Sequence, residues 1–324
     1  MSYITKKKKP NQQPRKRNTK RNAAFKNRTP KPTEKGMTLH SVQEEIELLP
    51  FLLKTLSTRS RNSVKSILAR GQVSVNDKVI TQYNHPLKAG QTVGIISNQE
   101  AIKKSNLIGI EIIHEDDDLI VINKDAGLLS VAASDPTEMT VYTQLSDYVK
   151  MTHPNNRIFV VHRLDRDTSG VMLYAKSEEM KEALQEDWNT RVKERLYTAL
   201  VEDVVENDQG TVSSWLKENV AMKVYSSPVD NGGKLAITHY RKVLGNSNYT
   251  LLEVELETGR KNQIRVHLQD IGHPIVGDKK YGSESNPMKR LGLHATTLVL
   301  VHPKTNKLVR YTAPAPNAFL RLVK

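Results

Sequence analysis

The sequence contains no cysteine, which excludes disulfide scaffolds, thiolate zinc sites, iron–sulfur clusters and cysteine nucleophiles together. No apolar run approaches the roughly 18 residues that a membrane-spanning helix needs, and no signal-peptide segment follows the first residue. The phosphate-loop pattern GxxxxGK[ST], the dinucleotide pattern GxGxxG and the zinc-protease pattern HExxH are also missing, which disfavours nucleotide hydrolysis, dinucleotide redox chemistry and zinc hydrolysis. These absences predict a cytoplasmic protein that needs neither a metal nor an organic cofactor.

Positive charge is concentrated at one end of the chain. The 324 residues carry 49 Lys and Arg against 35 Asp and Glu, a formal net charge of +14. Residues 1–36 hold 13 of these basic residues and one acid, Glu34, so they carry +12, while the remaining 36 basic and 34 acidic residues nearly cancel. The segment has few large apolar residues, and residues 1–40 are therefore predicted to form a disordered tail. Three interpretations remain open: an arm that binds phosphates, a solubility tail, or a mitochondrial transit peptide.

A small helical segment is predicted directly after the tail. Residues 61–70 should form a helix, because Val64, Ile67 and Leu68 have the spacing of one buried face and a glycine follows at position 71. Arg61 and Lys65 are four residues apart and therefore share another face of this helix.

A hairpin is predicted over residues 73–80, where valines alternate around an Asn–Asp turn. A helix pair with a basic face, followed by the hairpin pattern Gly–x–Val–x–Val–Asn, resembles the S4-like RNA-binding module over about residues 41–97. The resemblance implies that Arg61 and Lys65 contact RNA. The alternative is a small helix–hairpin domain whose basic side chains are simply solvated.

A polar linker over residues 98–108 is predicted to lead into a second domain, residues 109–324. Strands are expected at 110–113, 119–122, 158–161, 171–175, 196–201, 250–255 and 297–301, and helices at 178–188 and 263–271. Strands outnumber helices, and several connections are too short for crossover helices. We therefore predict an α+β domain with a mixed, largely antiparallel sheet.

The segment His162–Gly170, which reads HRLDRDTSG, carries the strongest chemical signal. It lies between two predicted strands, so Asp165 is expected at a strand exit with a Thr–Ser–Gly turn behind it. The alternative is a charged β-turn whose arginines and aspartates pair on the surface. The acidic run Asp116–Asp118 could bind Mg²⁺, but solvated acids are also ordinary at the start of a strand.

Other segments decide between these alternatives. Tyr197 lies on a predicted strand, Arg265 falls within TGR-x-x-QIRVHL, and GHPI-x-GD-x-x-YG follows shortly after. Together with HRLD-x-x-TSG and NK-x-AGL at residues 123–128, these motifs resemble the RluA family of RNA pseudouridine synthases over about residues 109–324. The chain departs from the family pattern at Asp125, where Pro is usual, and at Lys261–Asn262, where Thr–His is common. Neither departure touches the presumed catalytic carboxylate.

The resemblance implies an isomerase that breaks the N1–C1′ bond of a uridine, rotates the uracil and joins C5 to C1′. This reaction is redox-neutral and needs no phosphoryl donor. The resemblance assigns the catalytic carboxylate to Asp165, which could either attack C1′ or remove the 2′ proton.

Three further side chains receive roles from the resemblance. Arg265 is expected to pair with Asp165 and hold it ionised, because a nearby cation lowers a carboxylate pKa; alternatively it is a surface residue of its helix. Tyr197 would stack on the uracil and help to remove the C5 proton, or would simply belong to the core. Arg163 would fill the space left by a base that has flipped out of its stack, or would pair with Asp167. His162 has no evident partner and is interpreted as structural.

The predicted substrate is structured RNA, with large-subunit ribosomal RNA favoured and transfer RNA possible. A catalytically silent RNA-binding or ribosome-assembly factor is the competing hypothesis, although such a protein would have no need of Asp165, Tyr197 and Arg265 together. An RNA methyltransferase is disfavoured because the second domain has no glycine-rich cofactor loop.

Overall fold

The computed structural model describes residues 36–57, 59, 61–69, 71–96, 107–132 and 138–324. Residues 1–35 of the predicted tail and most of the predicted linker lie outside these ranges. The predicted end of the tail at residue 40 is wrong, because Met37–Ser41 forms a strand that pairs with Thr92–Ile96. Within them, no helix has both the length and the apolar character required to cross a lipid bilayer.

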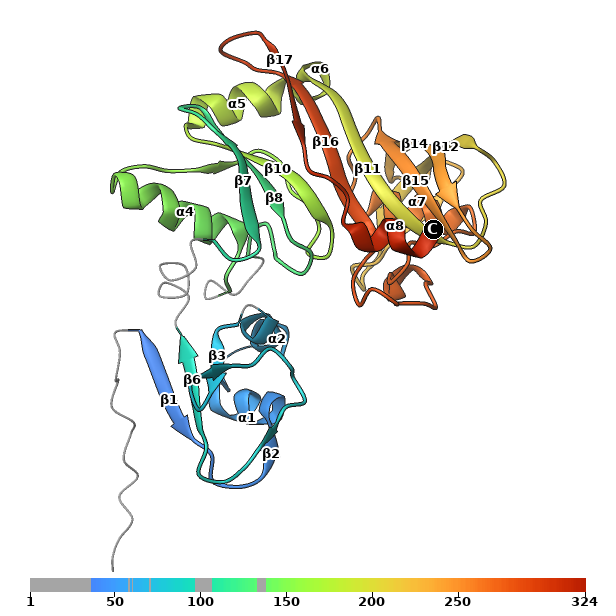
Figure 1. Ribbon diagram of the computed structural model, residues 1–324. Helices are drawn as coiled ribbons and strands as arrows, with labels where there is room; N and C mark the ends of the chain where they lie inside the picture. Colours follow the sequence, from blue (N-terminus) through green and yellow to red (C-terminus); the bar gives the residue numbers. More distant parts are fainter. Residues whose placement is uncertain (1–35, 58, 60, 70, 97–106, 133–137) are drawn as a thin grey trace, which may run out of the picture.

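The described part begins with a small unit that has its own core (Figure 1). Its elements are β1 (Met37–Ser41), β2 (Ile46–Glu47), α1 (Leu48–Thr55), α2 (Arg61–Ala69), β3 (Val73–Val75), β4 (Lys78–Val79), β5 (Pro86–Leu87) and β6 (Thr92–Ile96). Four strands pair in the order β1-β6-β3-β4, and β2 pairs with β5. The predicted apolar face of α2 is confirmed, since Val64, Ile67 and Leu68 are all buried against α1 and the sheet.

A large sheet dominates the rest of the chain, in the order β13-β12-β14-β15-β11-β16-β10-β8-β7, with β17 beside β16 and β9 beside β10. Its strands are β7 (Ile110–Glu115), β8 (Leu119–Lys124), β9 (Phe159–Val160), β10 (Ser169–Ala175), β11 (Val192–Glu202), β12 (Gln209–Glu218), β13 (Val224–Ser227), β14 (Lys234–Gly245), β15 (Tyr249–Leu256), β16 (Leu293–Val301) and β17 (Leu308–Thr312). All seven predicted strands are present. The predicted mixed, largely antiparallel α+β class is confirmed.

Helices cover this sheet only in part (Figure 1). They are α4 (Val141–Thr152), α5 (Glu178–Glu186), α6 (Trp188–Arg191), α7 (Gln263–Asp270), the 3₁₀ turn η1 (Lys279–Tyr281) and α8 (Asn317–Val323). Ser177 caps α5 by accepting a hydrogen bond from the Met180 N–H. The predicted helix 178–188 is confirmed as far as Glu186, but its predicted end is wrong, because the backbone leaves helical geometry at Asp187 before α6 begins. The sequence analysis also missed α4, whose capping box pairs Thr140 with Thr143 where Glu or Gln is the usual partner.

Two halves of the sheet meet at the short pairing of β10 with β16. This is the one parallel pairing among the described strands, and it joins Ser169 to His294 and Gly170 to Ala295. Gly170 has φ +115°, and a Cβ atom there would lie 2.1 Å from the Ala295 carbonyl oxygen. Only glycine allows the strands to approach this closely. The loop that carries Asp165 enters the sheet at this junction.

Candidate active site

An open pocket at the junction brings the predicted residues together. Asp165 precedes β10, Tyr197 lies on β11, Arg265 lies on α7, and all three line one hollow of about 390 Å³ that includes an open mouth. Arg163 lines the same hollow. We call it the Asp165 pocket. It combines apolar walls with a few converging polar groups, as small-ligand sites do.

A buried lysine, Lys124, holds the loop that contains Asp165. Lys124, at the end of β8, is 0% exposed. Its Nζ donates hydrogen bonds to the carbonyl oxygens of Asp125 at 2.9 Å, Leu128 at 2.7 Å and Arg166 at 2.9 Å. The Gly127 N–H also donates to the Arg166 carbonyl at 2.9 Å. Lys124 therefore links Arg166, the residue after Asp165, to residues 125–128. Lys124 belongs to the NK-x-AGL motif, but no role was predicted for it from the sequence.

The Lys124→Met variant should lower the free energy of unfolding by about 3 kcal/mol, because three buried carbonyl oxygens lose their donor at about 1–3 kcal/mol each, partly offset by removing a buried charge. Urea unfolding measures this difference, and Lys150→Met provides the matched control, since Lys150 is exposed near the end of α4. Equal stability of the two variants would show that Lys124 does not anchor the loop.

The stability conferred by Lys124 should also depend on pH. Burial lowers the pKa of Lys124 to about 7, although the charges of Asp167, Asp125 and Asp165 oppose this shift. Between about pH 7 and the ordinary lysine pKa of 10.5, the unfolded chain therefore binds more protons than the folded one. The wild type should gain stability relative to Lys124→Met as the pH rises through this window, and unfolding at several pH values would measure the gain. A constant difference would contradict it.

Arg265 makes the predicted contact with Asp165, but its strongest partner is another carboxylate. Its Nη1 lies 3.3 Å from Asp165 Oδ2, whereas Nε and Nη2 donate to the two oxygens of Asp278 at 2.7 and 2.9 Å. The Asp278 side chain is only 1% exposed and that of Asp165 is 31% exposed. Burial alone would lower the pKa of Arg265, but Asp278 and then Asp165 raise it above its ordinary value. The two hydrogen bonds from Arg265 to Asp278 therefore fix the guanidinium in the orientation that contacts Asp165.

The surroundings of this ion pair restrict its movement. The Arg265 guanidinium lies 5.0 Å from the centre of the Tyr281 ring, and its Nη1 also donates to Asn262 Oδ1 at 3.2 Å. Asn262 precedes α7 in the left-handed conformation, φ 54°, and donates from Nδ2 to the Tyr281 hydroxyl at 2.9 Å. Arg265 lies beside the buried face of α7 that carries Ile264 and Leu268. Neither Asp278 nor Tyr281 was predicted from the sequence to contact Arg265, although both belong to the motif GHPI-x-GD-x-x-YG.

Tyr197 packs against two clusters of buried apolar side chains, one that includes Leu164 and Met172 and one that includes Val254 and Leu268. It also lines the Asp165 pocket. Burial raises the pKa of Tyr197 to about 12, the charge of Arg195 opposing and that of Asp165 adding to this effect. Its phenol is therefore protonated at neutral pH. This state favours stacking and hydrogen-bond donation over direct action as a base.

The remaining charges of the HRLDRDTSG loop do not form the surface network that was the alternative to a site. Arg163 is exposed, and in the described part of the chain no carboxylate lies within ion-pair distance of it, so it is not paired with Asp167. Arg166 instead pairs with Glu138 at 3.2 Å. His162 accepts a hydrogen bond from the Leu173 N–H at 3.1 Å, and burial lowers its pKa to about 4. It is neutral and structural, as interpreted.

Arg61 and Lys65 are exposed on α2, as their spacing predicted. Neither forms an ion pair with any other described residue. The structure places them in the small unit, on a different element from any residue of the Asp165 pocket.

Comparison with known proteins agrees with this geometry. The family model described as RNA pseudouridylate synthase matches residues 118–270, which include Asp165, Tyr197 and Arg265. A protein of Bacillus subtilis (strain 168), described as an uncharacterized RNA pseudouridine synthase, is 32% identical over 269 residues, covering 82% of this chain and 88% of its own length. The ribosomal large subunit pseudouridine synthase D of Haemophilus influenzae is 32% identical over 280 residues, covering 82% of this chain and 86% of its own length.

Solved structures show the same relationship. The structure titled Human RNA Pseudouridylate Synthase Domain Containing 4 superimposes with a TM-score of 0.55 at 25% identity, covering 68% of this chain and 92% of its own. The extent of these matches and the arrangement of the pocket lead to one conclusion: this chain belongs to the RNA pseudouridine synthases, a family of isomerases that act on RNA.

Proposed function

We propose that this protein converts specific uridines of large-subunit ribosomal RNA to pseudouridine, with Asp165 as its catalytic carboxylate. The observation that carries the proposal is the meeting of Asp165, Tyr197 and Arg265 in one pocket from three distant segments. Large-subunit RNA is favoured over transfer RNA because a relative of similar length and 32% identity is named for that substrate.

The pocket supports a reaction that one carboxylate can drive. Asp165 is half-exposed toward the pocket, and Arg265 is held against it without enclosing it. The carboxylate can therefore meet a ribose at C1′ or at the 2′ position, and both mechanisms remain compatible with this arrangement. No group in this scheme requires a metal or an organic cofactor.

The target base must leave its stack to reach such a pocket. Arg163 is exposed at the pocket mouth and has no described ion-pair partner, so its planar guanidinium is free to stack in the vacated space. Tyr197 can stack on the flipped uracil from the wall.

The Tyr197→Phe variant should bind RNA normally and form pseudouridine about 10²-fold more slowly, because it keeps the ring but loses the hydroxyl that would assist proton transfer. Tyr197→Ala should lose affinity as well, since the stacking surface is gone. Single-turnover kinetics at saturating enzyme separates the two effects. Full activity of Tyr197→Phe would leave stacking as the only role of this residue.

The small unit and the tail fit an RNA-binding extension of the enzyme. We assign residues 1–36 to a phosphate-binding tail, 37–97 to an S4-like domain, 98–108 to a linker and 109–324 to the catalytic domain; the tail ends before Met37 because β1 is part of the sheet of the small unit. The separate core around α1 and α2 supports this division. Arg61 and Lys65 are exposed and form no ion pair with another described residue, which supports RNA contact by α2.

Mapping pseudouridines in cellular RNA with and without the gene tests the proposed function. Pseudouridine is isomeric with uridine, so the mapping must use selective chemical tagging. Loss of particular large-subunit sites, restored by the wild-type chain but not by Asp165→Asn, is the expected result. Loss confined to transfer RNA would reassign the substrate, and an unchanged map would favour the catalytically silent RNA-binding factor.

A further inference from the structure

A second hollow adjoins the Asp165 pocket on the side of the Arg265–Asp278 pair. It has a volume of about 800 Å³ including its open mouth, and Arg265 lines both hollows. One wall comes from residues 126–127 and Asp167, and the other from the segment 277–291. We call it the lysine recess, after Lys279, Lys280 and Lys289.

The charge of the lysine recess is strongly positive. Besides these three lysines, the basic groups that line it are Arg265 and Arg290, and the acidic groups are Asp167 and Asp278. Asp278 is already neutralised by its two hydrogen bonds to Arg265. Among the residues that line the recess, the lysines and Arg290 therefore face one further carboxylate, that of Asp167, and the nearby charge of Asp125 also acts on Arg290.

These cations also lack direct carboxylate partners. Across the described residues, neither Lys279 nor Lys289 forms an ion pair, and the Lys280 Nζ donates only to the Met222 carbonyl oxygen at 3.1 Å. Arg290 donates to neutral oxygens, the Ser169 hydroxyl at 2.6 Å and the Leu291 carbonyl at 3.1 Å.

Basic residues elsewhere on the large sheet are paired more directly. Arg241 meets Glu253 at 2.8 Å, and Arg310 meets Glu194 at 2.8 Å. Lys279, Lys280, Lys289 and Arg290, which have no ion-pair partner among the described residues, favour the binding of an anion in the hollow that they line. The anion would displace only water from these cations, and not a carboxylate that already pairs with them.

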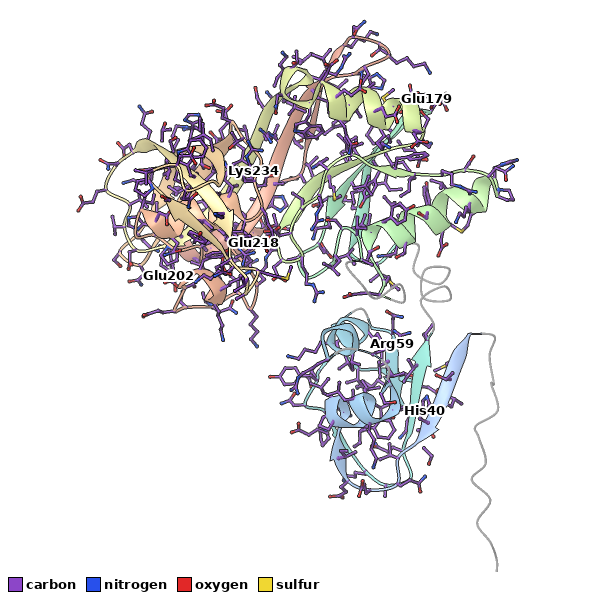
Figure 2. The ribbon with its side chains drawn as sticks, turned by 180° about the vertical axis from the view of Figure 1, so that it is seen from behind. His40, Arg59, Glu179, Glu202, Glu218 and Lys234 are labelled. Carbon is purple, nitrogen blue, oxygen red and sulfur yellow. The ribbon has the colours of Figure 1, made fainter. Side chains whose placement is uncertain are left out.

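The wall that carries the lysines is anchored to the sheet. Glu202 at the end of β11, labelled in Figure 2, accepts hydrogen bonds from the Ser283 hydroxyl at 2.7 Å and the Ser285 N–H at 2.8 Å. Gly277 has φ +83°, and a Cβ atom there would lie 2.4 Å from the Arg290 carbonyl oxygen. The two ends of the lysine-bearing segment are therefore packed together before any ligand arrives.

We propose that the lysine recess binds backbone phosphates of the RNA next to the uridine that enters the Asp165 pocket. The inference rests on the proposed function, and the covalent structure of RNA supplies its reason. A base held in the Asp165 pocket carries its own phosphates to within one nucleotide of the pocket mouth, and the adjoining recess presents cations on a fixed wall. Such contacts position the strand without reading its sequence.

The salt dependence of RNA binding tests this inference. The test variant carries Lys279→Ala and Lys289→Ala, which remove two unpaired cations of the recess. The control variant carries Lys150→Ala and Lys307→Ala, two exposed lysines. Lys307 lies between β16 and β17, and the nine-residue strand β16, about 30 Å long, separates it from Leu291 at the recess. Both full-length variants also carry Asp165→Asn, so that no product forms during binding to a large-subunit ribosomal RNA fragment.

Each phosphate contact contributes about 0.7–0.9 to the slope of log affinity against log salt. The test variant should lose about 1.4–1.8 units of slope relative to Asp165→Asn alone, whereas the control variant should keep its slope. With an active Asp165, the same two recess substitutions should raise KM and leave kcat nearly unchanged. Equal slopes for the test and control variants would overturn the inference.

The two proposals can fail separately. If the wild type forms pseudouridine but the recess variant keeps its slope and KM, only the lysine recess is wrong. If the slope falls as expected but the wild type forms no pseudouridine, the recess binds RNA and the proposed function fails.

Discussion

The Asp165→Asn variant should form pseudouridine at less than about a hundredth of the wild-type rate while its RNA affinity changes little. Asparagine keeps the size of the side chain but removes its charge, its nucleophilicity and its ability to take a proton. Asp165 lies in a loop and not in the core, with its side chain 31% exposed, so the fold should tolerate the change. Single-turnover product formation and RNA binding by filter retention measure the two quantities.

A matched substitution two residues away provides the control. Asp167→Asn makes the same chemical change in the same loop, on an exposed side chain that lines the lysine recess and lies outside the Asp165 pocket. It should keep the wild-type single-turnover rate at saturating enzyme, because Asp167 does not line the Asp165 pocket. If Asp165→Asn keeps more than about a hundredth of the wild-type rate, Asp165 is not the catalytic carboxylate and the proposed mechanism fails.

The Arg265→Met variant should lose activity by about two orders of magnitude or more and also lose stability. Activity falls because Asp165 loses the cation 3.3 Å from its carboxylate. Stability falls by about 3–5 kcal/mol because the Asp278 carboxylate, 1% exposed, is left buried without its partner. Activity assays below the unfolding transition and urea unfolding measure these effects.

A double variant separates the two effects. Arg265→Met combined with Asp278→Leu removes the buried carboxylate together with its cation, so it should recover most of the lost stability. Activity should remain as low as in Arg265→Met, because Asp165 still lacks its partner. Recovery of both stability and activity in the double variant would reduce Arg265 to a structural residue.

Local patterns in the sequence predicted seven of the eleven strands of the large sheet but not β12, β13, β14 or β17. Apolar spacing in residues 61–70 indicated a helix, and α2 buries Val64, Ile67 and Leu68 as expected. Short apolar runs bounded by polar turns indicated the strands of the sheet junction. Patterns failed where the signal was weak: α4 begins with an unusual capping box, and the helix after Ser177 breaks at Asp187.

The sequence by itself also identified the residues that we propose carry the chemistry. Asp165, Tyr197 and Arg265 lie in motifs whose order and length resemble one enzyme family, so their meeting could be expected without coordinates. Their proximity then depends on β10, β16 and β11 lying side by side, which Gly170 permits.

Only the tertiary structure decided which charges neutralise one another. Asp278 lies 13 residues beyond Arg265 and holds it more closely than Asp165 does, and Lys124 reaches the carbonyl of Arg166 from 42 residues away. The sequence around Lys279, Lys280 and Lys289 does not distinguish them from other lysines, but folding places them around one hollow, where none of them forms an ion pair with a described carboxylate. Charge pairing depends on distances of a few ångströms across the fold, and such distances follow no local period in the sequence.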